Sequence, residues 1–143
     1  MTRYSPEVLD HFHRPRSPGV LADADAVGRA GTPGRGPYLV LYLRWDGARV
    51  TAASFQTYGC PPAIAAGSLL AARVPGLTLA DARAWADEAR VREALGGLPA
   101  HKHHCSRLAA EALAAALRGL APDPSPDPSR EASPDPTPSP RSS

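Results

Sequence analysis

Three residues of this sequence carry side chains that favour metal or sulfur chemistry: Cys60, His104 and Cys105. Imidazole and thiolate are ligands for zinc and iron, and thiolate is also the form of cysteine that attacks sulfur. The chain has only 2 cysteines and no paired C-x-x-C motif, so spacing alone does not identify a zinc ribbon. A buried, inert thiol and a solvated histidine cluster are the alternatives that these residues leave open.

Both cysteines are expected near the start of a helix. Cys60 follows the strand break at Gly59 and precedes Pro61-Pro62, a pair that suits the first turn of a helix. Cys105 is expected just before or within the first turn of the last helix. The partial positive charge and unpaired N–H groups of a helix N-terminus stabilise a thiolate. We therefore expect both sulfurs to favour the thiolate form.

Capping residues and hydrophobic periodicity predict the elements that position these side chains. Ser5-Pro6-Glu7 indicates a helix start, and alternating leucines in 38–45 followed by Asp46-Gly47 indicate a strand and a two-residue hairpin turn. The predicted fold class is α+β, a small antiparallel three-stranded sheet packed by N-terminal and C-terminal helices. The expected elements are a helix from residue 6 to before 15, an edge strand near 22–30, strands over 38–45 and about 49–58, a helix over 61–74, a helix or broken pair after 78 to about 95, and a helix from about 105 to 118.

Composition divides the chain into a folded part and a tail. Of the 17 prolines, 8 fall in the last 23 residues, where Ala121 and Ala132 are the only apolar side chains. Such a stretch buries too little apolar surface to offset its ordering entropy. We expect one folded domain over residues 1–120 and a disordered Pro/Ser/Asp-rich tail over 121–143. Deleting residues 122–143 should leave metal binding unchanged.

Charge and hydropathy exclude several classes of function. The formal net charge is +2, and the arginines are scattered without a basic run, so nothing indicates a nucleic-acid partner. The N-terminus lacks the apolar core of a secretory signal, and no apolar run approaches the ~18 residues of a membrane span. We therefore expect a cytoplasmic protein with reduced thiols and no membrane partner.

Three segments resemble the motifs of one family and occur in the same order. The segments are Tyr4–Phe12 with Arg14–Gly19, Phe55–Cys60 with Ala63–Ser68, and His104–Ala109 with Ala112-Leu113. On these motifs, the sequence over about residues 3–118 resembles the U-type (IscU/NifU-like) iron–sulfur cluster assembly scaffolds. The resemblance implies an α+β scaffold that binds iron, builds a [2Fe-2S] cluster and passes it to recipient apo-proteins, with sulfur arriving as a persulfide from a cysteine desulfurase.

The resemblance implies roles for individual residues of the second and third segments. Cys60 matches a ligand cysteine, His104 matches an alternative ligand, and Cys105 matches a cysteine that is both a ligand and the persulfide acceptor. Apart from the resemblance, the count of ligands makes His103 or His101 a candidate for a fourth one.

The resemblance also implies a partner-binding residue. Lys102, the only lysine of the chain, matches the lysine of a short segment that binds a dedicated chaperone in some members of the family. In this sequence that segment is Leu98–Lys102, and Ala100 and His101 replace the proline and valine of the usual pattern.

One motif of the family is missing. Its members carry Cys-Gly-Asp just before the strand expected to begin near Tyr38, where this sequence has Gly34-Arg35-Gly36. One thiolate and one carboxylate are therefore absent, and three ligands remain for a cluster that uses four. Arg35 could attract an anionic cluster or persulfide, and a homodimer could pool ligands.

Two functions of different class follow, and we favour the first. The first is a non-enzymatic scaffold or sulfur acceptor that holds a labile [2Fe-2S] cluster or persulfide. The second is a degenerate module that binds zinc through Cys60, His104 and Cys105, or docks on a cysteine desulfurase, without building a cluster. A Cys–His hydrolase is the weakest alternative, because adjacent side chains at a helix start diverge and are poorly placed as base and nucleophile.

Overall fold

The structure is a computed structural model that describes residues 4–32 and 34–120. Within these residues it confirms the α+β class and the three-stranded antiparallel sheet. The expected disorder of residues 121–143 lies outside the described residues, and the domain boundary at 120 stays a prediction. The elements are α1 (Pro6–His13), β1 (Ala26–Gly31), β2 (Tyr38–Trp45), β3 (Val50–Tyr58), α2 (Pro61–Arg73), α3 (Leu79–Ala84), α4 (Glu88–Ala94), the short 3₁₀ helix η1 (Ala100–Lys102) and α5 (His103–Leu120).

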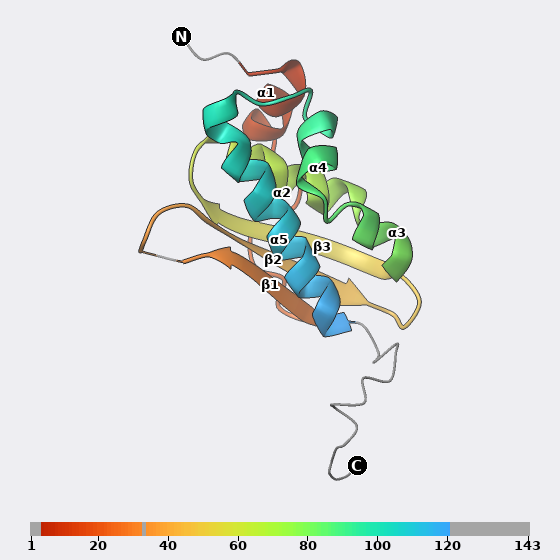
Figure 1. Ribbon diagram of the computed structural model, residues 1–143. Helices are drawn as coiled ribbons and strands as arrows, with labels where there is room; N and C mark the ends of the chain where they lie inside the picture. The colour runs from red at the N-terminus through yellow and green to blue at the C-terminus, as the bar shows by residue number, and fades with distance from the viewer. Residues whose placement is uncertain (1–3, 33, 121–143) are drawn as a thin grey trace, which may run out of the picture.

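The sheet has the order β1-β2-β3 and is packed by helices (Figure 1). Every second residue of β2 points into the core, and Leu39, Leu41 and Leu43 have no solvent exposure. Helix α5 packs against β1 and β2, α2 packs against β3, and the two helices contact each other. Within the described residues, no helix is long and apolar enough to cross a bilayer.

The connection between β2 and β3 differs from the expected two-residue turn. Pairing ends where Trp45 lies opposite Val50, with a register shift just before it, so residues 46–49 form the loop. The Oδ1 atom of Asp46 accepts hydrogen bonds of 2.8 and 2.7 Å from the backbone N–H groups two and three positions further along the chain. This side-chain turn satisfies the loop backbone and is the reason why Asp46 favours a wider loop.

Side-chain caps place the helix ends close to the expected positions. Ser5 accepts from the Val8 backbone N–H at 3.0 Å, and Thr78 caps α3 in the same way. The region up to Leu95 is a broken pair of helices, because Asp87 caps a new helix, α4. The last helix begins earlier than expected. Its helical backbone starts with η1, directly after Pro99, and continues into α5.

Two glycines allow the helices to lie close to the sheet. A β-carbon at Gly28 would lie 2.0 Å from the Ala112 carbonyl oxygen and 2.4 Å from the Ala116 nitrogen, both of α5. A β-carbon at Gly67 of α2 would lie 2.5 Å from the ring of Phe55 in β3. Any larger residue would force the layers apart, so these glycines set the distance between each helix and its strand.

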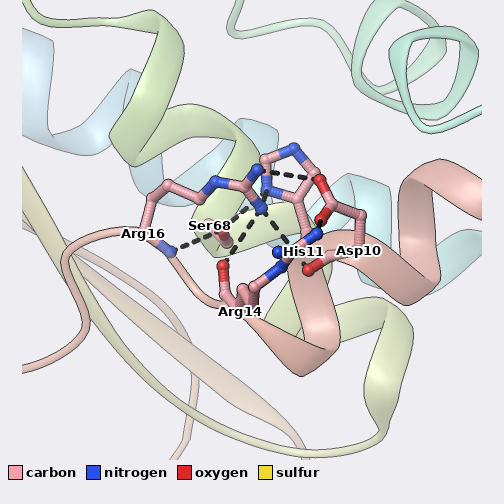
Figure 2. A network of polar contacts seen from close by, with 5 residues as sticks. All are labelled: Asp10, His11, Arg14, Arg16 and Ser68. Atoms are coloured by element: carbon pink, nitrogen blue, oxygen red, sulfur yellow. Dashed lines mark hydrogen bonds and ion pairs between the residues drawn. The ribbon is translucent and has the colours of Figure 1, made fainter.

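A polar network fixes α1 and the segment after it to α2 (Figure 2). The fully buried Ser68 has its Oγ 2.7 Å from His11 Nδ1, and this Oγ accepts the backbone N–H of Arg16 at 2.8 Å. Arg16 Nη1 lies 3.3 Å from the same His11 Nδ1. Because arginine can only donate, Nδ1 is an acceptor and the neutral ring carries its proton on Nε2. Asp10 completes the network through ion pairs with Arg14 and Arg16.

Candidate metal centre

The side chains of Cys60, His104 and Cys105 lie together. The two Sγ atoms are 3.4 Å apart, the Cys105 Sγ is 3.6 Å from His104 Nε2, and all three donor atoms lie within 4.8 Å of one another. Zinc–ligand bonds of about 2.0–2.3 Å place the donors of a tetrahedral ion about 3.3–3.8 Å apart. The group therefore fits a single ion with only small side-chain adjustments.

The contact between α2 and α5 brings these residues together. Cys60 follows β3 and is the N-cap of α2, and its side chain makes no capping hydrogen bond. Its half-buried sulfur is therefore available to Cys105, the fully buried third residue of α5. His104 precedes Cys105 and is half-buried. The three donors thus form a site that is closed on the core side and open on the surface.

The expected stabilisation of a Cys105 thiolate by a helix N-terminus is wrong for the metal-free protein. Burial, together with the hydrogen bond and the negative charge of Cys60, raises the pKa of the Cys105 thiol to about 12. The helical backbone starts with η1, where the N–H groups of Lys102 and His103 already bond to carbonyls. Cys105 therefore lies past the unpaired N–H groups, and desolvation dominates.

Lys102 lies beside the centre, and His103 points elsewhere. The charge of Cys60 and its hydrogen bonding raise the pKa of the Lys102 amine. The exposed His103 has its Nε2 3.0 Å from the Leu98 carbonyl oxygen. Across residues 4–32 and 34–120, neither His103 nor the exposed His101 belongs to the group of donor atoms. The structure thus assembles three of the candidate ligands and leaves the other two outside.

A pocket of about 340 Å³ adjoins the centre on the side of His104. Arg35, from the loop between β1 and β2, and Arg107, from α5, also line it. Arg35 occupies the place of the missing family motif. Arg107 was not predicted from the sequence, although its position three residues after His104 places both on one face of a helix.

A second feature missed from the sequence is a pair of aromatic rings at the end of the sheet. Tyr58, 66% exposed, stacks on Tyr38 with the ring centroids 6.2 Å apart. Alternation alone would assign Tyr58 to the outer face of β3. The sequence pattern does not specify the register between β2 and β3, which places Tyr58 opposite Tyr38.

Comparisons with known proteins identify the family and agree with the observed fold. Residues 3–121 match the family described as "NifU-like N terminal domain". The chain is 44% identical over 114 residues to "Iron-sulfur cluster assembly scaffold protein IscU 1" of Archaeoglobus fulgidus, covering 80% of this chain and 74% of that protein. It is 42% identical over 125 residues to "Nitrogen fixation protein NifU" of Cereibacter sphaeroides, covering 83% of this chain and 50% of that protein.

Two solved structures show the same fold at low sequence identity. The N-terminal part of a NifU-like protein from Brucella abortus has a TM-score of 0.66 at 22% identity, covering 81% of this chain and 92% of that chain. A protein described as a "Putative iron-sulfur cluster assembly scaffold protein for SUF system" from Fervidobacterium islandicum has a TM-score of 0.57 at 18% identity, covering 80% and 96%.

Proposed function

Because the chain belongs to the family of NifU-like N-terminal domains, we propose that it is a scaffold for iron–sulfur cluster assembly and holds its cargo at Cys60, His104 and Cys105. The relative at 44% identity, which is named an iron–sulfur cluster assembly scaffold protein, supports the scaffold role. The proposed role is non-enzymatic, because the protein collects iron and sulfur and hands them on. The observation that carries the assignment of the site is the convergence of the three donor atoms within 4.8 Å.

The donor set suits temporary binding. Two thiolates and one imidazole are ligands that iron accepts, but they are one fewer than the four that hold a [2Fe-2S] cluster permanently. One donor, Cys60, is half-buried, so a recipient protein can reach the site from the surface. We therefore propose a labile [2Fe-2S] cluster as the cargo.

In the proposed cycle Cys105 accepts sulfur. Its thiolate attacks the outer sulfur of a persulfide on the donor, the donor's S–S bond breaks, and the donor cysteine leaves as a thiolate while Cys105 becomes the persulfide. The thiol must first lose its proton, which its raised pKa opposes in the metal-free state. A metal ion held by Cys60 and His104 would favour this loss, because a thiol that coordinates a metal is deprotonated.

The scaffold family implies two kinds of partner, a sulfur donor and recipients of clusters. We propose a cysteine desulfurase as the donor and apo-proteins as the recipients. Lys102 lies close enough to Cys60 for the two to interact, which supports a partner-binding role for the segment Leu98–Lys102. Its role in binding a chaperone stays a prediction, as does the cytoplasmic location.

A zinc-binding module is the second candidate function. Gly34-Arg35-Gly36 stands in the sequence where the family carries further ligands. Cys60, His104 and Cys105 by themselves suit an open tetrahedral zinc site. This reading predicts a bound ion without cluster chemistry.

Anaerobic reconstitution with ferrous iron, cysteine and a desulfurase, completed by a thiol reductant that supplies the electrons for sulfide, tests the two functions. A scaffold develops the visible absorption of a [2Fe-2S] chromophore, and Cys60→Ser, Cys105→Ser and His104→Ala each abolish it. His103→Ala is the matched control, because His103 bonds to Leu98 and should leave the chromophore intact. No chromophore, with about one zinc per chain by metal analysis, would support the zinc module. A persulfide on Cys105 without a cluster would limit the function to sulfur acceptance.

A further inference from the structure

We propose that the pocket lined by Arg35, Arg107 and His104, called here the arginine pocket, binds a small thiol that carries a carboxylate, and that this thiol supplies the ligand missing from the metal centre. The inference rests on the proposed function, because it takes Cys60, His104 and Cys105 as metal ligands. It adds a ligand-binding role to the two arginines.

The arginine pocket has the size and position for such a ligand. Its volume of about 340 Å³ lies at the lower end of the range for small-molecule sites. His104 forms part of its wall and also contributes a donor atom to the metal centre. A molecule in the pocket is therefore next to the coordination sphere.

The charge of the arginine pocket favours an anion. No lining residue is acidic, and Arg35 forms no ion pair with any carboxylate of residues 4–32 and 34–120. Arg107 Nε lies 3.8 Å from Glu111 Oε2, which is beyond hydrogen-bond distance. Both guanidinium groups can therefore donate hydrogen bonds to a carboxylate. The planar fork of arginine N–H groups matches the two oxygens of a carboxylate.

The metal centre favours a thiolate as the other end of the same ligand. Three protein donors leave one position of a tetrahedral ion open, and a thiolate matches the soft ligands already present. Two guanidinium groups beside a bound cation repel it unless an anion lies between them. A thiol with a carboxylate meets both requirements. It gives its thiol proton to solvent on binding, its thiolate bonds to the metal and its carboxylate bonds to the arginines.

The inference can be tested on the full chain with cobalt(II), which takes the place of zinc and has an absorption spectrum that responds to its ligands. The protein is first loaded with one equivalent of cobalt, and the thiolate-to-cobalt charge-transfer absorption reports Cys60 and Cys105. Two probes that differ only in the carboxylate, 3-mercaptopropionate and 3-mercapto-1-propanol, are then titrated. The increase in charge-transfer absorption measures each added thiolate, and equilibrium dialysis checks that cobalt stays bound.

We expect 3-mercaptopropionate to bind at least about tenfold more tightly than 3-mercapto-1-propanol, in line with the energy of a charge-assisted hydrogen bond. The double variant Arg35→Gln/Arg107→Gln should remove this preference and bind cobalt at least as tightly as the wild type, because two charges that repel the cation are gone. Arg118→Gln is the matched control, because Arg118 is an exposed arginine of the same helix, 11 residues or about 16 Å further along α5.

The outcomes separate this inference from the proposed function. Failure of the wild-type protein to bind cobalt would overturn the assignment of the metal centre itself. Cobalt binding with equal affinity for the two thiols, or a preference that survives in the double variant, would overturn only the arginine pocket. Simple propionate, which lacks the thiol, should leave the charge-transfer absorption unchanged.

Discussion

The Sγ atoms of Cys60 and Cys105 lie 3.4 Å apart although 45 positions separate the two residues in the chain. One sulfur stands at the junction of β3 and α2, and the other belongs to α5. The short distance between the two sulfurs is therefore a consequence of the packing of α2 against α5. The same packing makes the two thiols chemically different, because it leaves Cys60 half-buried and Cys105 fully buried.

Alkylation should distinguish the two thiols. In the metal-free protein at pH 7.5, we expect iodoacetamide to modify Cys60 at least about tenfold faster than Cys105, because Cys105 is buried and its pKa is raised to about 12. Mass spectrometry of peptides after timed quenching measures both rates. In Cys60→Ala, Cys105 should react faster than in the wild type, because the neighbouring charge and hydrogen bond are gone. Equal rates for the two thiols would contradict the geometry.

Metal binding should stabilise the fold. Zinc at a free concentration of about 100 times its dissociation constant should raise the free energy of unfolding by about 2.7 kcal/mol, because the three donors are assembled only in the folded chain. Urea denaturation with and without zinc measures the increase, and a chelator should reverse it. The same increase in Cys60→Ser would show that zinc binds elsewhere.

Gly28→Ala should destabilise the protein by about 1–3 kcal/mol, because the added β-carbon would meet the backbone of α5 at 2.0 Å. Urea denaturation gives the change in the free energy of unfolding. The matched control is Gly119→Ala in α5, where the added β-carbon would lie at an ordinary 3.4 Å from Ala26. This control should cause no loss, because alanine favours a helix. A loss of the same size in both variants would exclude the close approach as the cause.

Acid should weaken the fold through His11. Desolvation and the charges of Arg16 and Arg73 lower the pKa of His11 below 6.5, although Asp10 opposes them. Below pH 6.5 the unfolded chain therefore binds more protons at this residue than the folded chain, and the free energy of unfolding falls as the pH decreases.

Unfolding by urea from pH 8 to pH 5 measures this dependence on pH. The variant His11→Asn should flatten the part of the profile below pH 6.5. His13→Asn removes an exposed imidazole from the same helix and serves as the control. If both variants give the same profile as the wild type, the network around Ser68 does not respond to the protonation of His11.

Local signals in the sequence predicted most of the framework. The leucines at every second position of 38–45 specify β2 because one face of the strand must be buried. Ser5 and Thr78 mark helix starts because their hydroxyl groups accept backbone N–H groups that lack a partner within the helix. The prediction of a two-residue turn after Trp45 was wrong. The Asp46 side chain accepts hydrogen bonds from the loop backbone, and these favour a four-residue loop.

The site could be predicted only in part. Cys60, His104 and Cys105 were identified from their types and from a family resemblance, and the structure brings them together. The protonation of Cys105 depends on burial by helices far apart in the sequence, so a local argument about its helix was wrong. Arg107 was missed because the pocket beside His104 exists only when α5 lies next to the loop that contains Arg35.

Two of the three donors are consecutive residues on a single helical turn, whereas the third precedes a different helix. A partner that displaces the first turn of α5 therefore carries two donors away from Cys60 in one movement. A single movement of the backbone at the start of α5 would then break the bonds from both donors to the cargo together, so release would not proceed one bond at a time.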